Sequence, residues 1–314
     1  MTSPGLGDRA PLGVLSVTRR IVLCLLSCAT ALLLAGCGGP PSLPTAAPTP
    51  TPTPTLSPKV VIVSVDGLRP DAFDETTVPN LLGLSRRGAY TWKAQTVFPS
   101  TTLPAHTSML TGVLPSVHGL TWDDYSPEKG SLAVPTVFAL ARTAGLRTVL
   151  VVGKEKFRHL DVAGAVDTFV LTTRGDADVA NEAIVQAQAG FDLMFVHFPD
   201  TDLAGHASGW LSPAYMATLT AADAAIGRLL QALPTEATVI VTSDHGGHGA
   251  THGSSDAEDM TIPWIVAGPR VTAVGRELTT SVHTVDTTVT ALHVLGLTAP
   301  TSTSGAVVKE AFGE

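Results

Sequence analysis

Cysteine is scarce in this sequence of 314 residues, which contains three. Cys24 and Cys28 lie in an apolar stretch near the N-terminus, and the third is Cys37. If the N-terminal stretch is removed during export, Cys37 alone remains, and a framework of disulfide bonds is excluded. The fold must therefore form without such cross-links.

Basic residues are also few, because 19 lysines and arginines stand against 27 aspartates and glutamates. Removal of residues 1–36 would leave 26 acidic and 16 basic residues, a formal net charge of −10. This balance argues against a nucleic-acid-binding surface, so no stable complex with nucleic acid is expected. It leaves a phosphate substrate open, because bound divalent cations reverse the local field.

The N-terminal apolar run falls short of the ~20 residues that span a bilayer. It covers the fifteen residues from Ile21 to Ala35 and follows Arg19 and Arg20, as in a signal peptide. Its end, Leu34-Ala35-Gly36-Cys37, resembles the lipobox of bacterial lipoproteins, which implies cleavage before Cys37 and a lipid on that cysteine. The alternative is an ordinary secretory leader. We expect an exported chain, anchored by lipid to the outer face of the bacterial cell membrane.

Three segments follow from this composition. Residues 1–36 are the predicted signal peptide, and residues 37–58, rich in proline and threonine, form a spacer that cannot bury a core. Residues 59–314 form one body without internal repeats, of a size that a single α/β domain fills.

Short runs of β-branched residues alternate with longer helical stretches in this body. The expected strands are Lys59–Val65, Arg147–Val152, Phe191–Phe198, Ala237–Thr242 and Trp264–Ala267. The expected helices are Pro79–Arg87, Pro104–Leu110, Val134–Ala144, Asp176–Ala189, Pro213–Ala232 and Val285–Leu295. Such alternation predicts an α/β fold, with a mostly parallel sheet covered by helices on both faces. Ligands of such folds bind beyond the carboxyl ends of the strands.

Acidic and histidine residues follow three of the expected strands. They are Asp66, Asp200, Asp202, His206, Asp244 and His245. Asp202 and His206 are four residues apart, which places both on one side of a helical turn. Buried carboxylates and imidazoles at one sheet edge need cations as partners, although each aspartate alone could be a helix cap or a turn residue. The mixture of Asp and His suits zinc or manganese better than calcium.

A second feature is the hydroxyl-rich segment from Phe98 to His106, which leads into an expected helix. Pro104 fits the first helical turn, so Thr102 lies at or next to the N-cap. There a hydroxyl faces free backbone N–H groups and the positive end of the helix dipole, which stabilise an alkoxide and attract a phosphate. Taken alone, Thr102 is a routine cap, whereas beside a metal it is a candidate nucleophile.

Four motifs together resemble the alkaline phosphatase superfamily, and within it the nucleotide pyrophosphatase/phosphodiesterase branch. They are Asp66-Gly67, FPSTTLPAH with TSMLTG, PDTDLAGH and SDHG, in the family's order over residues 60–268. The resemblance implies an alkaline-phosphatase-like three-layer sandwich and two divalent ions, zinc or alternatively manganese. One ion would be held by Asp66, Thr102, Asp244 and His245. The other would be held by Asp202, His206 and His252, with His248 and His283 as rivals for the last ligand.

The resemblance also implies that Thr102 is the nucleophile and that Leu103 and Asp123 contact the substrate. The family usually has asparagine at the position of Asp123, where it donates to a phosphate oxygen. An ionised aspartate would repel that oxygen. Asp123 is therefore protonated, in contact with another cation, or elsewhere in a loop.

The function implied is a metal-dependent phosphoric ester hydrolase that acts on a small molecule, with nucleotides among the candidates. Thr102 would displace the leaving group, and the phosphothreonine would then be hydrolysed. The absence of Lys or Arg close to Thr102 in the sequence favours phosphodiesters over phosphomonoesters or phosphonates. A sulfatase is disfavoured, because Thr102-Leu-Pro-Ala-His106 lacks the cysteine and arginine of that family's motif. A solute-binding lipoprotein is the non-enzymatic alternative, which would show two similar lobes.

Overall fold

The computed structural model describes residues 57–130 and 132–314. The predicted signal peptide, Cys37 and nearly all of the predicted spacer lie outside the described residues, so those predictions stay predictions. Within the described ranges, none of the helices combines the length and the apolar character that crossing a bilayer requires.

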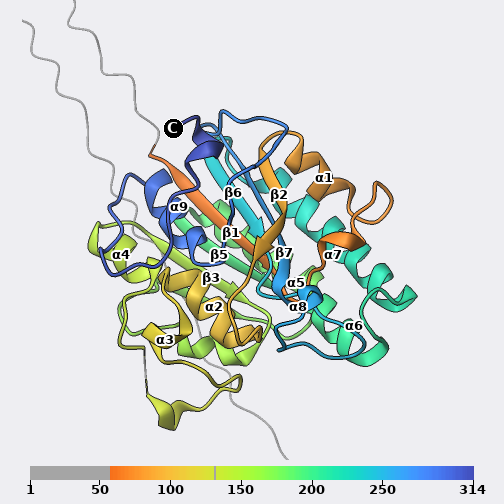
Figure 1. Ribbon diagram of the computed structural model, residues 1–314. Coiled ribbons are helices and arrows are strands. Elements are labelled where there is room, and N and C mark those ends of the chain that lie inside the picture. Colours follow the sequence, from red (N-terminus) through yellow and green to blue (C-terminus); the bar gives the residue numbers. More distant parts are fainter. Residues whose placement is uncertain (1–56, 131) are drawn as a thin grey trace, which may run out of the picture. The chain divides into compact units, whose positions relative to one another are not determined.

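An eight-stranded sheet forms the middle layer, with the strand order β4-β3-β5-β1-β6-β7-β2-β8 (Figure 1). The strands are β1 (Lys59–Val65), β2 (Ala89–Gln95), β3 (Thr148–Val152), β4 (Thr168–Leu171), β5 (Leu193–Phe198), β6 (Ala237–Thr242), β7 (Thr261–Ala267) and β8 (Arg276–Glu277). The five strands β4, β3, β5, β1 and β6 are parallel to one another, whereas β7 is antiparallel to both β6 and β2. The central strands are mostly apolar and are buried along nearly their whole length, because both faces of the sheet are covered.

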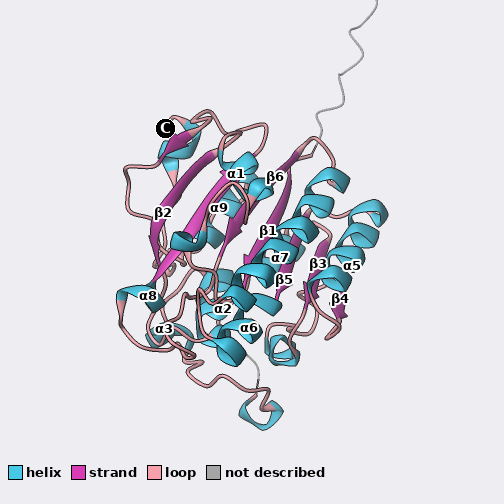
Figure 2. Ribbon diagram, turned by 90° about the vertical axis from the view of Figure 1, so that its right-hand side faces the viewer, coloured by secondary structure: helices cyan, strands magenta, loops and turns pink. Residues whose placement is uncertain are grey.

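Helices cover the two faces of the sheet (Figures 1 and 2). One layer contains α2 (Thr102–Thr111), α3 (Pro115–His118), α4 (Val137–Thr143) and α9 (Asp286–Val294). The other contains α1 (Pro79–Ser85), α5 (Asp176–Ala189), α6 (Asp200–Ser208) and α7 (Pro213–Ala232). Alternate residues of β1 face opposite layers, since Val60 and Ile62 belong to the first core and Val61 and Val63 to the second. The remaining short helices are α8 (Ala257–Met260) and the 3-10 helices η1 (Pro70–Ala72), η2 (Pro127–Lys129), η3 (Glu155–His159) and η4 (Lys309–Phe312).

The predicted α/β class with a mostly parallel sheet is confirmed. Strands β2, β4 and β8 were not predicted. The sequence of β2, AYTWKAQ, has no continuous apolar run, and its burial is interrupted because it lies near the sheet edge. Strand β4 is half-buried and β8 has two exposed residues, so neither carries the hydrophobic pattern that identifies a buried strand.

Four strand ends meet at one edge of the sheet. Strand β1 lies between β5 and β6 in parallel, and its Ser64 is in register with both His197 and Thr242. The residues just after these three strands are therefore neighbours in space. Strand β2 ends at the same edge, because β7 is antiparallel to both β6 and β2. Residues 96–101 lead from β2 into α2, so the fold delivers the start of this helix to the strand ends.

Candidate active site

Asp66, the residue after β1, is fully buried at this edge. Its Oδ2 accepts a hydrogen bond of 2.8 Å from Nε2 of His197, whose Nδ1 accepts one from a backbone N–H. Gly67 follows in a left-handed conformation with φ of 68°, and its N–H donates to Oδ1 of Asp244 at 3.2 Å. A Cβ on Gly67 would lie 3.2 Å from Asp202. Glycine therefore lets the end of β1 approach the residues that follow the neighbouring strands.

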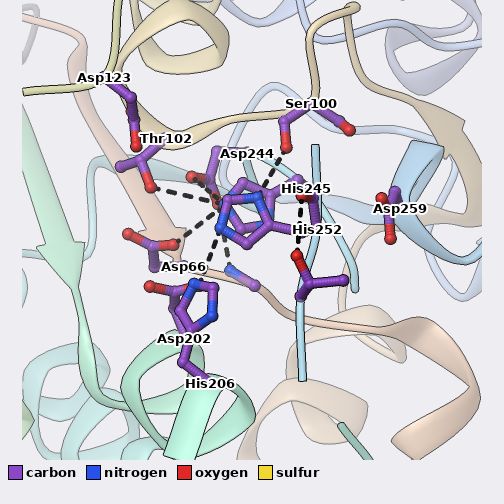
Figure 3. A network of polar contacts seen from close by, with 12 residues as sticks. Asp66, Ser100, Thr102, Asp123, Asp202, His206, Asp244, His245, His252 and Asp259 are labelled. Atoms are coloured by element: carbon purple, nitrogen blue, oxygen red, sulfur yellow. Dashed lines mark hydrogen bonds and ion pairs between the residues drawn. The ribbon is translucent and has the colours of Figure 1, made fainter. Parts of the chain in front are cut away.

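Asp244 and His245 follow β6 and are fully buried (Figure 3). Nε2 of His245 lies 3.4 Å from Oδ1 of Asp66 and 3.3 Å from Oδ2 of Asp244. Neither of these carboxylate oxygens accepts a hydrogen bond within the described part of the chain. Because a buried carboxylate oxygen without a partner is costly, the donor atoms of these three residues fit a shared cation.

A second group lies next to the first. Oδ1 of Asp202, in the first turn of α6, is 3.5 Å from Nε2 of His206 and 3.5 Å from Nε2 of His252. This oxygen is also buried and accepts no hydrogen bond from a described residue. The His252 ring stacks on His245 with 3.7 Å between centroids, so the two groups adjoin. The His206 side chain is 45% exposed, whereas that of His252 is 8% exposed, so the second group is more open to solvent.

Among the candidates for the last ligand, His252 lies beside Asp202 and the two rivals lie elsewhere. Nδ1 of His252 contacts the Ser100 carbonyl at 2.9 Å, which leaves Nε2 directed at Asp202. Such a hydrogen bond on the far nitrogen is common for metal-binding histidines. His248 instead contacts Asp259 at 2.7 Å. His283 is exposed and lies 3.6 Å from Asp286. Asp200, which also follows an expected strand, accepts a hydrogen bond from the backbone N–H of Asp176.

The charges of this cluster act on one another. Burial raises the pKa of Asp66, but the Lys154 ammonium and the imidazoles of His197 and His245 hold it well below its usual range. Burial and the charge of Asp66 raise the pKa of Asp244 to about 7. Burial, with the neighbouring His245, lowers the pKa of His252 to about 4. Burial opposes the charged form of His245, but the carboxylates of Asp244 and Asp66 raise its pKa to about 10, so this imidazole lies in a site that attracts positive charge. Carboxylate and imidazole donors together suit zinc or manganese.

Thr102 begins α2, with Thr101 as its N-cap, so the helix starts two residues earlier than predicted. The side chain is buried, and its Oγ1 lies 3.5 Å from Nε2 of His245. One turn later, Nδ1 of His106 contacts the Thr102 carbonyl at 2.7 Å, while its Nε2 contacts Ser64 Oγ at 2.8 Å. These contacts fix the first turn of α2 against β1. A hydroxyl at the positive end of a helix dipole thus faces the first group. We call Thr102 and the residues of the two groups the strand-end cluster.

Two lysines that the sequence analysis missed reach this region from the segment after β3, Lys154 just before η3 and Lys156 within it. Nζ of Lys154 lies 2.7 Å from Asp66 Oδ2 and 2.6 Å from Asp202 Oδ2. Nζ of Lys156 lies 2.7 Å from Asp123 Oδ2. No Lys or Arg lies close to Thr102 in the sequence, but the fold brings these two lysines to residues that adjoin it. A signal was present, because Gly-Lys-Glu-Lys directly follows the predicted strand Arg147–Val152 and thus lies at the edge where ligands bind.

Asp123, which the sequence analysis names as a substrate contact, has two partners of its own. Its Oδ1 accepts a hydrogen bond of 2.7 Å from the Leu103 N–H, next to Thr102, while its Oδ2 faces Lys156. Of the three interpretations of Asp123 given above, the structure agrees with contact to another cation, which is the Lys156 ammonium. Figure 3 shows Asp123 on the Thr102 side of the cluster. We call residues 120–130 together with η3 the flank.

Comparison with known proteins places these features in a family context. The family described as type I phosphodiesterase / nucleotide pyrophosphatase matches residues 60–141 and 123–260. An uncharacterised pyrophosphatase/phosphodiesterase of Schizosaccharomyces pombe is 27% identical over 214 residues, which cover 60% of this chain and 44% of that protein. The catalytic subunit of human GPI ethanolamine phosphate transferase 2 is 28% identical over 229 residues, 66% of this chain and 23% of that protein. The chain thus spans less than half the length of these relatives.

Solved structures share the fold at low sequence identity. Murine ectonucleotide pyrophosphatase/phosphodiesterase 5, as an inactive variant in complex with AMP, superimposes with a TM-score of 0.67 at 16% identity, covering 77% of this chain and 96% of that chain. A 2-O GAG sulfatase superimposes with a TM-score of 0.68 at 15% identity, covering 82% of this chain and 75% of that chain. At such identities the likeness shows the alkaline-phosphatase-like sandwich alone, which enzymes for different esters share.

Proposed function

Because the chain belongs to the type I phosphodiesterase / nucleotide pyrophosphatase family, we propose that it hydrolyses phosphoric esters with Thr102 as nucleophile and two divalent metal ions. The observation that carries this proposal is the convergence of three buried carboxylates and two imidazoles on the start of α2. Oδ1 of Asp66, Oδ1 of Asp202 and Oδ2 of Asp244 accept no hydrogen bond from a described residue, as expected of metal ligands.

The residues available to hold the two ions fall into the two groups described above. One ion would be held by Asp66, Thr102, Asp244 and His245, and the other by Asp202, His206 and His252. When bound, a pair of divalent ions neutralises charge on the phosphoryl group and stabilises the attacking and leaving oxygens. Zinc fits this set of nitrogen and oxygen donors, with manganese as the alternative.

The chain's own residues supply the nucleophile and its position. In the first step Thr102 Oγ1 forms a bond to phosphorus, the ester bond breaks, and the proton of the hydroxyl leaves with the departing alcohol. In the second step water cleaves the phosphothreonine and restores the hydroxyl. The contacts of His106 hold the Thr102 backbone, so that the hydroxyl is oriented before the substrate arrives.

A small phosphodiester or pyrophosphate is the proposed substrate, and a nucleotide is the leading candidate. The AMP bound by the murine structural neighbour supports this choice. The single sheet with one core on each face, seen in residues 57–130 and 132–314, does not form the two similar lobes of a solute-binding lipoprotein.

The decisive experiment combines a substitution with metal removal. Turnover of bis-p-nitrophenyl phosphate and of a nucleotide p-nitrophenyl diester would be measured for the purified chain and for Thr102→Ala. We expect Thr102→Ala to lower kcat on the order of 10³-fold or more, because the substitution removes the proposed nucleophile. Chelation should abolish turnover, and zinc or manganese should restore it. Activity that survives both treatments would refute the proposal.

The location of the enzyme is a separate part of the proposal. The lipobox-like Leu34-Ala35-Gly36-Cys37 supports attachment by lipid to the outer face of a bacterial membrane. Metabolic labelling with a radioactive fatty acid should mark the chain, and Cys37→Ala should remove the label. Labelling that persists in Cys37→Ala would exclude this anchor.

A further inference from the structure

The flank holds a cation at a fixed place beside the nucleophile. Nε2 of His159, in η3, contacts the backbone N–H of Ser126 at 2.9 Å and Nε1 of Trp122 at 3.4 Å. The His159 ring also lies edge-on to Trp122 and Tyr125, with centroids 5.7 and 5.1 Å apart. These contacts fasten the loop that carries Asp123 to the short helix that carries Lys156.

Asp123 joins this cation to the start of α2. One carboxylate oxygen accepts from the Leu103 N–H at 2.7 Å, and the other lies 2.7 Å from the Lys156 ammonium. One carboxylate group therefore separates the ammonium from the backbone beside Thr102. The two side chains are 36% and 18% exposed, so water screens the pair only in part.

The pair of Asp123 and Lys156 also has N–H donors that no described residue accepts from. A lysine ammonium has three N–H donors, and among the described residues Lys156 donates to Asp123 alone. An ionised aspartate by itself would repel a phosphate oxygen, but paired with Lys156 it adds no net charge. The free ammonium protons can then form charge-assisted hydrogen bonds to an oxygen of the phosphoryl group, and these are roughly twice as strong as neutral ones.

From this arrangement we propose that Lys156 gives the site a further activity, the hydrolysis of phosphomonoesters. The proposal rests on the proposed function, because it uses the same Thr102 and the same cluster. A phosphodiester carries one negative charge on the reacting phosphoryl group, whereas a phosphomonoester carries close to two above about pH 6. The added charge gains most from the Lys156 ammonium. Thr102 forms the bond to phosphorus, the monoester's alcohol leaves with the proton, and water then releases inorganic phosphate.

The test compares two substrates that share a leaving group, p-nitrophenyl phosphate and p-nitrophenyl ethyl phosphate, at pH 8 on the metal-loaded full chain. Lys156→Met removes the ammonium while keeping most of the side-chain volume. We expect kcat/KM for the monoester to fall about 10- to 100-fold, the range for loss of a charge-assisted hydrogen bond, and that for the diester to stay within about threefold. Lys156→Arg should recover part of the monoester rate. The Ki for inorganic phosphate should rise in Lys156→Met, which reports binding without turnover.

Asp123→Asn should change the preference for monoesters in the opposite direction to Lys156→Met. Asparagine can still accept from the Leu103 N–H, but it no longer neutralises Lys156, so the monoester-to-diester ratio of kcat/KM should rise severalfold. The matched control is Lys129→Met, since Lys129 lies in the same flank but stacks over the Trp122 ring, 4.7 Å from its centroid. Its ratio should equal that of the unmodified chain.

Two results would overturn the inference while leaving the proposed function intact. One is an equal loss on both substrates in Lys156→Met, and the other is a ratio that falls in Asp123→Asn. Absence of monoester turnover in the unmodified chain would likewise overturn it. A failure of the proposed function looks different, because turnover of the diester would then survive in Thr102→Ala.

Discussion

The strand-end cluster and the flank both border Thr102, but they are built in different ways. In the cluster, Asp66, Asp244 and His245 follow parallel strands and are fully buried. In the flank, Asp123 and Lys156 come from a loop and a 3-10 helix and remain partly exposed. A sheet edge fixes side chains closely enough to share an ion, whereas loops accept change more readily. We therefore propose that the cluster carries out the hydrolysis and that the flank adjusts which phosphoryl groups this chain accepts.

The largest expected effect comes from replacing an aspartate by asparagine, once in the cluster and once in the flank. Asp244→Asn should lower zinc affinity and diester kcat/KM by more than about 100-fold. Loss of a residue that only hydrogen-bonds to a metal ligand costs at most about that much, and Asp244 is proposed to bind the ion itself. Asp123→Asn should leave zinc affinity unchanged, because Asp123 contacts Leu103 and Lys156 instead of the cluster. Isothermal titration with zinc and steady-state kinetics measure both quantities. Equal losses of zinc affinity in the two variants would contradict the distinction between a metal-binding cluster and a flank that does not bind metal.

A smaller effect concerns the two groups within the cluster. Since the His206 side chain is 45% exposed and the first group is fully buried, chelation should remove metal in two phases. The faster phase should belong to the group of Asp202. His206→Ala should lose that ion during purification and keep the other one. Metal content measured against time of chelation provides the check, and a single phase of two ions would contradict it.

Acid should loosen the flank before it affects the strands. Burial lowers the pKa of His159 below its ordinary value of 6.5, so this residue favours folding in its neutral form. The stabilisation is present above pH 6.5 and is lost as the pH falls from there toward the lower folded-state value, because the unfolded chain then binds more protons. Hydrogen-exchange protection of the Ser126 N–H, corrected for intrinsic rates, should fall between pH 7.5 and 5.5. Protection of the Val63 N–H in β1 serves as the control, and parallel loss at both positions would speak against a flank-specific effect.

The smallest expected effect lies outside both regions. The Thr136 side chain caps α4 by accepting a hydrogen bond from the Ala139 N–H at 3.3 Å. Thr136→Ala should lower the free energy of unfolding by about 1 kcal/mol, as loss of an N-cap does. Denaturant titration measures this loss. The monoester-to-diester ratio should stay constant, and a changed ratio would mean that the flank responds to distant packing.

The buried parts of the fold were readable from the sequence, since a buried parallel strand is a continuous apolar run. Strands β1 and β6 and helices α5 and α7 have the predicted bounds. The partly exposed β2 was not predicted, although it delivers Thr102 to the sheet edge. Because side-chain alternation weakens near a sheet edge, its pattern carries little signal.

The candidate site likewise has a part that the sequence shows and a part that it does not. Asp202 and His206 belong to a local motif, and Asp244 and His245 are adjacent, so their association is visible in the sequence. The pair of Asp123 and Lys156 joins residues 33 positions apart, through a loop whose course only the tertiary structure fixes. Local spacing could not show that the carboxylate already has a partner.

Diffraction data collected on either side of the zinc absorption edge, from crystals of the zinc-loaded protein, would test the two-ion site most directly. We predict two anomalous peaks, each within bonding distance of one group of ligands. The first group is Asp66, Thr102, Asp244 and His245, and the second is Asp202, His206 and His252. Zinc bound elsewhere on the chain, with no peak beside Thr102, would contradict this account.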